Sequence, residues 1–143
     1  MTMTTESTDA IRVLLVDDEL IMRMAIKRAF GKANIPNPIF EARDGIEALA
    51  MLRREGFEPV TRPYIIMLDL NMPKMSGIEF LRELRSDPKL RNSVVFVLTT
   101  SHDEKDIFAA YDLNVAGYIV KSNLGQGFNR LTTLLHAYST VDM

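Results

Sequence analysis

The feature that most constrains the fold of this chain is an alternation, repeated five times, of short apolar runs with helical patterns. The apolar runs are rich in β-branched residues or bounded by turn signals, as buried strands are. They span residues 11–16, 39–42, 64–68, 94–98 and 116–120. After each run, apolar residues recur at helical spacing, in segments that begin near Met22, Ile46, Ile78, Asp103 and Leu124.

Strict alternation of this kind predicts a parallel sheet with helices on both faces, because each β–α–β crossover is right-handed and covers the strands it joins. We therefore expect an α/β fold of the doubly wound (βα)5 type, with a five-stranded parallel sheet. A chain of 143 residues fits one domain. We expect a tail over residues 1–10, the domain over residues 11–138 and a short tail over residues 139–143.

Composition excludes several classes of protein. The chain has no cysteine, which rules out disulfides and thiolate metal sites. Its 17 basic and 19 acidic side chains give a net charge of −2 without a basic run, which argues against a nucleic-acid partner. No apolar run approaches the roughly 20 residues that span a bilayer, and the N-terminus lacks the apolar core of a signal peptide. We expect a cytoplasmic protein without a membrane partner.

Polar residues stand where four of the five expected strands end. They are Asp17 with Asp18, Asp69, Thr99 and Lys121. The carboxyl ends of parallel strands share one edge of the sheet, and ligands of such folds bind there. We expect these carboxylates, the hydroxyl and the ammonium group to converge in one cleft.

Three close carboxylates point to a particular chemistry. They repel one another, so that their pKa values rise unless a cation lies among them. Oxygen ligands without His or Cys favour a hard ion such as Mg²⁺. One carboxylate can then attack phosphorus and form an acyl phosphate, while metal and lysine neutralise the phosphoryl oxygens. The set predicts phosphoryl transfer to an aspartate.

Each of these residues also has a simpler interpretation when taken alone. Asp17 or Asp18 could cap the first helix, and Asp69 could be a turn residue. Thr99 could be structural and Lys121 an ordinary surface lysine. Their joint occurrence, with about two βα units between Asp17 and Asp69 and two more before Lys121, favours the functional interpretation.

Four motifs carry a resemblance to a known family. They are LLVDDE over residues 14–19, LDLNMPKMSG over 68–77, VLTTS over 97–101 and GYIVK over 117–121. In this order and spacing they resemble the receiver domains of two-component response regulators, the CheY-like family. The resemblance covers about residues 11–138 and implies a flavodoxin-like sheet with strand order 2-1-3-4-5.

The resemblance implies a phosphorylation site and a Mg²⁺ site. Asp69 would be the phosphoacceptor. Asp18 and Asp69 would ligate Mg²⁺ through their carboxylates and Asn71 through its backbone carbonyl. Asp17 would hold the ion through water.

It also implies roles around the phosphoryl group. Lys121 and Thr99 would contact the phosphate, and Thr99 and Tyr118 would be the switch residues that move on activation. Asn71 and Ser101 are candidates for tuning the lifetime of the phosphorylated state.

The partners implied are those of a phosphorelay. The phosphodonor would be a histidine kinase or a histidine phosphotransfer protein, and the chain would be a regulatory phosphoacceptor rather than an enzyme. It would assist its own phosphorylation and dephosphorylation. With no DNA-binding output domain expected, phosphorylation would switch binding of a protein target through the fourth helix, fifth strand and last helix. Dimerisation through the last helix or strand stays open.

Two details refine the resemblance. The stretch YDLNVAGYIVK over residues 111–121, with LTTS and the long 56–63 connection, resembles the small regulators paired with bacterial phytochromes. Receivers usually carry proline after the lysine, often with a cis peptide bond, and here Ser122 follows. A cis bond before a non-proline residue costs about 2.5–4 kcal/mol, which favours a trans bond at Ser122.

Three rival interpretations belong to other classes. A phosphatase of the haloacid-dehalogenase type needs a second carboxylate two residues after its nucleophile, where Asn71 stands. A pseudo-receiver would keep the fold without phosphorylation. A flavodoxin-like nucleotide binder would need a Gly-rich phosphate loop after the first strand, where Asp17 and Asp18 would repel a phosphate.

Overall fold

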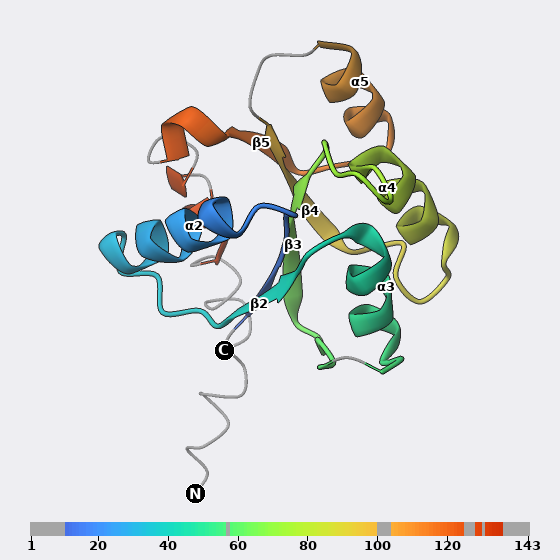
Figure 1. Ribbon diagram of the computed structural model, residues 1–143, viewed down its shortest axis with the longest axis horizontal. Coiled ribbons are helices and arrows are strands. Elements are labelled where there is room, and N and C mark those ends of the chain that lie inside the picture. The colour runs from blue at the N-terminus through green and yellow to red at the C-terminus, as the bar shows by residue number, and fades with distance from the viewer. Residues whose placement is uncertain (1–10, 57, 100–103, 125–127, 130, 136–143) are drawn as a thin grey trace, which may run out of the picture.

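The computed structural model describes residues 11–56, 58–99, 104–124, 128–129 and 131–135. Its centre is a five-stranded parallel sheet of order β2-β1-β3-β4-β5 (Figure 1). The α/β class and the strand order expected above are confirmed. The expected tails, Ser101 and the end of the last helix lie outside the described residues.

Strands and helices alternate along the whole described chain. The strands are β1 (Arg12–Val16), β2 (Ile39–Ala42), β3 (Tyr64–Asp69), β4 (Val94–Thr99) and β5 (Gly117–Val120). The helices are α2 (Leu20–Lys32), α3 (Gly45–Arg53), α4 (Gly77–Ser86) and α5 (Glu104–Asp112), followed by the 3-10 turn η1 (Lys121–Asn123). Residues 128–129 and 131–135 are also helical.

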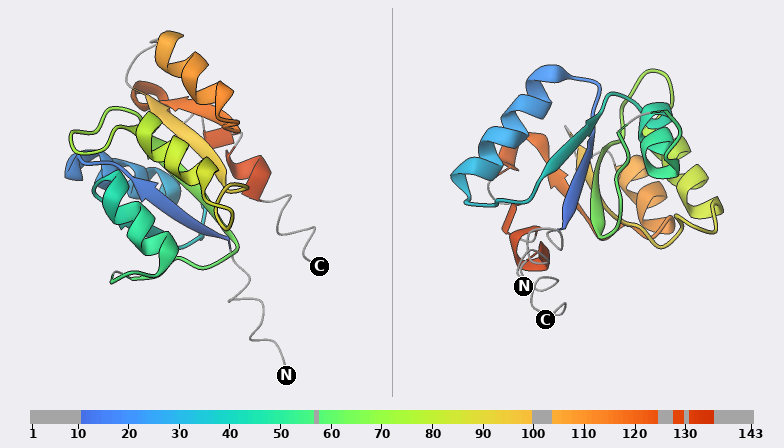
Figure 2. Two further views of the ribbon diagram at one scale, coloured as in Figure 1. Left: turned by 90° about the vertical axis from the view of Figure 1, so that its right-hand side faces the viewer. Right: turned by 90° about the horizontal axis from the view of Figure 1, so that it is seen from below.

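Two helical layers enclose the sheet, as Figures 1 and 2 show. α2 and the C-terminal helical residues cover one face, and α3, α4 and α5 cover the other. Alternation along β3 explains this arrangement, because successive side chains of a strand point to opposite faces. Ile65 and Met67 join the core beneath α2, which includes Ile26. Ile66 and Leu68 join the core beneath α3 and α4.

The strand ladder extends to the polar residues that end β3 and β4. Asp69 pairs with Leu98, and Thr99 pairs with Val120. The two strands are therefore one residue longer than the apolar runs that predicted them. β1 and β5 each begin one residue later than expected, at Arg12 and Gly117.

Local signals explain where α4 begins. Ser76 and Glu79 form a capping box, in which the Ser76 hydroxyl accepts from the Glu79 amide and the Glu79 carboxylate accepts from the Ser76 amide. Gly77 donates from its amide to the Leu70 carbonyl at 3.0 Å. A Cβ at Gly77 would lie 2.5 Å from Leu70 Cα and 2.7 Å from the Asp69 carbonyl oxygen. Only glycine allows this close approach, which holds the start of α4 against the loop after β3.

Among the described residues, no helix combines the length and apolar character needed to cross a bilayer.

Candidate functional site

The loop between β1 and α2 presents a buried carboxylate. Asp17 is 0% exposed, and its amide donates to the Ala42 carbonyl on β2 at 3.1 Å. Its Oδ1 accepts from the Glu19 amide at 2.9 Å. Glu19 is the N-cap residue of α2, and no side chain caps this helix. The capping interpretation of Asp17 therefore gives way to a turn that holds its carboxylate at the edge of the sheet.

Asp69 lies buried at the end of β3. It is 2% exposed, and its Oδ1 accepts from the Asn71 amide at 3.0 Å. Burial raises the pKa of Asp69 to about 6, although the Asn71 amide and the Lys121 ammonium act in the opposite direction. Desolvation of the charged form outweighs these contacts.

The carboxylates of Asp17, Asp18 and Asp69 form one cluster. One ligand oxygen from each lies within 4.8 Å of the others, with Asp18 exposed and the other two buried. Asp17 Oδ2 is buried and accepts no hydrogen bond from the described residues, although Lys121 Nζ lies at an ion-pair distance of 3.0 Å. A carboxylate oxygen left without a hydrogen bond beside two further carboxylates fits a divalent cation, which would complete its coordination.

Lys121 joins the cluster from the end of β5. Its Nζ lies 3.0 Å from Asp17 Oδ2, 3.3 Å from Asp69 Oδ2 and 3.6 Å from Glu19 Oε1. The side chain is buried, which alone would lower its pKa, but the Asp69 and Asp17 carboxylates outweigh burial and raise it. The peptide bond between Lys121 and Ser122 is trans, as expected for a serine at this position.

The remaining candidate residues that the structure describes lie on β4, on β5 and in the loop after β3. Thr99 is 4% exposed at the end of β4, where it pairs with Val120, the residue before Lys121. Asn71 is exposed and follows Asp69 by two residues. Tyr118 is half-buried on β5, and its ring meets that of Tyr111 edge to face at 6.5 Å between centroids.

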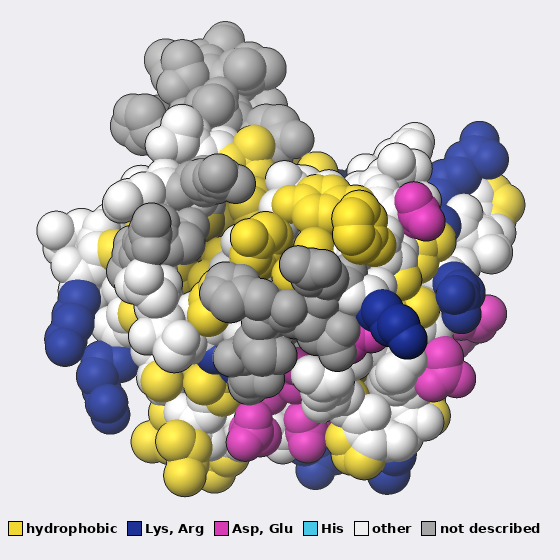
Figure 3. Space-filling view, turned by 90° about the horizontal axis from the view of Figure 1, so that it is seen from above, with side chains coloured by type: hydrophobic (Ala, Val, Ile, Leu, Met, Phe, Trp, Pro, Cys, Tyr) yellow, Lys and Arg dark blue, Asp and Glu magenta, His cyan; other side chains and the backbone are white. Residues whose placement is uncertain are grey.

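Figure 3 looks onto the face toward which β1 runs. Acidic side chains gather near the lower centre of this view, and hydrophobic side chains are exposed to their lower left and above them. Exposed apolar residues of the described chain include Leu20, Ile21 and Met24 on α2, directly after the acidic loop, and Phe108 and Tyr111 on α5.

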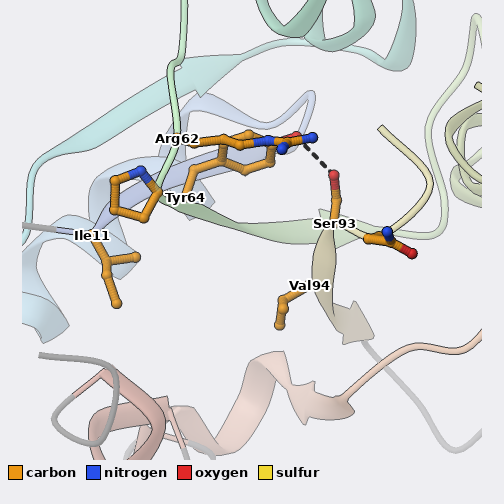
Figure 4. A pocket seen from close by; sticks show the side chains of 7 residues that line it. Ile11, Arg62, Tyr64, Ser93 and Val94 are labelled. Carbon is orange, nitrogen blue, oxygen red and sulfur yellow. Dashed lines mark hydrogen bonds between the residues drawn. The ribbon is translucent and has the colours of Figure 1, made fainter. Parts of the chain in front are cut away.

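A cavity of about 370 Å³ lies at the opposite end of the sheet, where the strands begin. Ile11, Tyr64 and Val94, at or next to the starts of β1, β3 and β4, line it together with Arg62 (Figure 4). The Tyr64 hydroxyl and the Ser93 hydroxyl share a hydrogen bond of 2.7 Å there. None of the described residues that line this cavity carries a carboxylate, and the cavity is separate from the acidic cluster.

Sequence reasoning missed two residues next to the cluster. Glu19 is the third acid of the run that begins at Asp17, and this adjacency was a usable signal. Arg23 lies six residues after Asp17, and its guanidinium donates to the Asp17 carbonyl at 2.7 Å. No motif marks this contact, because it depends on how α2 is rotated against the sheet.

The fold and the cluster of acidic residues are typical of one protein family, and comparison with known proteins identifies it. The family model described as the response regulator receiver domain matches residues 13–132. The chain belongs to this family. Its members are signalling proteins that receive a phosphoryl group from histidine kinases or phosphotransfer proteins, and they are generally not enzymes.

Individual relatives agree with this assignment. The chain is 39% identical over 121 residues to the response regulator Rcp1 of Synechocystis sp., covering 84% of this chain and 82% of that protein. It is 40% identical to the phosphorylated cyanobacterial phytochrome response regulator RcpA, with a TM-score of 0.71. The match covers 92% of this chain and 91% of that chain. The Mn²⁺-bound structure of Rcp1 is 34% identical, with a TM-score of 0.70 and the same coverage. The likeness to small regulators of the phytochrome-associated type is thereby confirmed.

Proposed function

We propose that this protein is a phosphorylation switch in which Asp69 accepts a phosphoryl group in a Mg²⁺-dependent reaction. The observation that carries the proposal is the contact of one lysine with two buried carboxylates. Lys121 Nζ lies 3.3 Å from Asp69 Oδ2 and 3.0 Å from Asp17 Oδ2. An ammonium group so close to the acceptor can neutralise charge on an incoming phosphoryl group.

Asp18 and Asp69 would ligate Mg²⁺ through carboxylates and Asn71 through its backbone carbonyl, while Asp17 would hold it through water. Bound Mg²⁺ supplies charge neutralisation at the phosphoryl oxygens. The preference for Mg²⁺ rests on the donor set, which contains only oxygen atoms.

The protein's own residues would carry out the transfer. The Asp69 carboxylate attacks phosphorus, one Asp69 O–P bond forms, and the bond from phosphorus to the donor's leaving group breaks. Lys121 would stay protonated throughout, since its pKa is raised by the neighbouring carboxylates. The Thr99 hydroxyl would bond to the phosphoryl oxygen, and Asn71, beside Asp69, would affect access of water.

The switch would operate through β5 and α5. Movement of Thr99 toward the phosphate would free space for Tyr118, whose ring now contacts Tyr111. A few charge-assisted hydrogen bonds can supply the roughly 5.5 kcal/mol that reverses a 1:99 equilibrium. A downstream protein would bind the face of α5, β5 and the C-terminal helix, where Phe108 is 70% exposed.

The phosphodonor would be a histidine kinase of the phytochrome kind or its phosphotransfer protein. The similarity to RcpA supports this choice. The exposed apolar residues Leu20 and Ile21 flank the acidic loop and would contact the donor.

Labelling with a small phosphodonor tests the proposal. Wild type should be labelled in the presence of Mg²⁺ and not after chelation, whereas Asp69→Asn should not be labelled. Asp112→Asn, on the exposed end of α5, is the matched control and should be labelled like wild type. Equal labelling of Asp69→Asn and wild type would refute the assignment.

A further inference from the structure

Arg23 is a buried cation that joins the acidic loop to the edge strand of the sheet. It is 8% exposed, and its guanidinium makes two charge-assisted contacts. One nitrogen donates to the Asp17 carbonyl at 2.7 Å, and Nε donates to Glu41 Oε1 on β2 at 2.9 Å. A planar guanidinium holds two acceptors at fixed angles, whereas an ammonium group contacts its acceptors without a fixed planar geometry.

The contact with the carbonyl fixes the peptide unit that links the two acidic residues. A peptide bond is planar, so holding the Asp17 carbonyl oxygen also sets the direction from which Asp18 continues. The Glu19 amide holds Asp17 Oδ1 from the other side at 2.9 Å. Together these contacts leave Asp17 Oδ2 and the Asp18 carboxylate directed at the site shared with Asp69.

Arg23 could act on a metal ion in two opposite ways. Its positive charge would repel a cation and weaken metal binding, whereas its hydrogen bond would orient the ligands and strengthen binding. Glu41 lies against the guanidinium and Lys27 donates to Glu41 Oε2 at 2.8 Å. The Lys27 hydrogen bond, aided by Arg23 and opposed by burial, holds the pKa of Glu41 below its usual value. An ionised Glu41, shared with Lys27, offsets part of the guanidinium charge, which favours the orienting effect.

We propose that Arg23 is a positioning residue for the divalent-metal site, acting through the Asp17 carbonyl. The proposal rests on the proposed function, since Asp18 and Asp69 must bind Mg²⁺ for it to hold. Residues that orient metal ligands without touching the metal typically change metal affinity by about 10–100-fold. If Arg23 only repelled the metal ion, its removal would instead strengthen Mg²⁺ binding.

Calorimetric titration with Mg²⁺ alone tests directly whether Arg23 strengthens or weakens metal binding. Arg23→Met should raise the Kd about tenfold or more. Arg23→Lys keeps the charge but offers one nitrogen in place of the fork, so it should raise the Kd by a smaller factor. At saturating Mg²⁺, the labelling rate of both variants with a small phosphodonor should recover toward that of wild type.

Two controls separate positioning from general loss of stability or charge. Arg28→Met removes an exposed cation from the same helix, and Ile26→Val loosens the buried face of that helix. Both should keep the wild-type Kd. If Arg23→Met does not fold, as judged by circular dichroism, the Mg²⁺ affinity of Arg23→Lys, compared with those of Arg28→Met and Ile26→Val, tests the positioning role.

The outcomes distinguish this inference from the proposed function. An unchanged or lower Kd in folded Arg23 variants, with normal binding by wild type, would overturn the positioning role alone. Absence of Mg²⁺ binding by wild type would overturn both proposals.

Discussion

At the scale of single residues, the site combines groups that are unstable together without a ligand. Asp69 is buried, and burial raises its pKa to about 6. Asp17 is fully buried, and within the described part of the chain one of its oxygens accepts no hydrogen bond. Lys121 compensates part of this charge through contacts with both carboxylates. The arrangement stores unfavourable electrostatic energy that a bound cation would relieve.

This energy should appear as a pH dependence of stability in the metal-free protein. The folded-state pKa of Asp69, about 6, lies above the usual value of 3.8 for an aspartate. The folded state therefore binds an extra proton between roughly pH 4 and pH 6. The contribution of Asp69 to the free energy of unfolding should fall as pH rises through this window and stay low above it.

Asp69→Asn removes the buried charge and should stabilise the metal-free protein at pH 7 by about 1–3 kcal/mol. Urea unfolding at pH 5 and pH 7, in the presence of a chelator, measures the difference. The gain should be smaller at pH 5. A variant less stable than wild type at pH 7 would mean that the Lys121 contact outweighs burial.

Gly77 supports the site through its lack of a side chain. Gly77→Ala places a Cβ against the backbone of Leu70 and Asp69, which cannot yield without moving the loop. We expect a loss of about 2–3 kcal/mol in the free energy of unfolding and a weaker affinity for Mg²⁺. Gly31→Ala, where a Cβ would meet nothing within 4 Å, is the control and should retain wild-type metal affinity.

At the scale of elements, α2 carries an exposed apolar surface that the core does not explain. Ile21 is 81% exposed and Leu20 is 59% exposed, directly after the acidic loop. Apolar side chains beside a reactive site are typical of a partner surface. The position of α2 therefore couples the loop that holds the carboxylates to the surface where a donor would bind.

Ile21→Ser should slow phosphoryl transfer from a protein donor about tenfold, equivalent to roughly 1.4 kcal/mol of lost contact. Labelling by a small phosphodonor should not change, because the carboxylates are untouched. Ile46→Ser, which replaces a 54% exposed apolar residue on α3, is the matched control. If Ile21→Ser slowed transfer from the protein donor and labelling by the small phosphodonor equally, its effect would lie in the phosphorylation site and not in binding of the donor.

The elements themselves follow from local sequence to a large extent. The apolar runs in β3 and β4 predicted these two strands, because burial on both faces leaves a continuous apolar run. The extra ladder residues, Asp69 and Thr99, could not be predicted from hydropathy. They remain in the strand because the neighbouring strands offer pairing partners at those positions.

At the scale of the whole molecule, topology brings the site together. Asp17, Asp69 and Lys121 are far apart in sequence but lie at or directly after the carboxyl ends of three parallel strands of one sheet. Their convergence could be predicted because parallel strands point the same way. The contact between Arg23 and the Asp17 carbonyl could not, since it depends on the rotation of α2 and on Glu41 of β2. A contact between two elements that leaves no local pattern in the sequence becomes visible only in the folded structure.

The central claim is that Asp69 forms an acyl phosphate when Mg²⁺ is present. Borohydride reduction of an aspartyl phosphate yields homoserine, and peptide mapping by mass spectrometry locates it. After incubation with a small phosphodonor and Mg²⁺, we expect homoserine at residue 69, and none when Mg²⁺ is chelated. Homoserine at Asp17 or Asp18 instead, or unmodified Asp69 under saturating Mg²⁺ and donor, would contradict it.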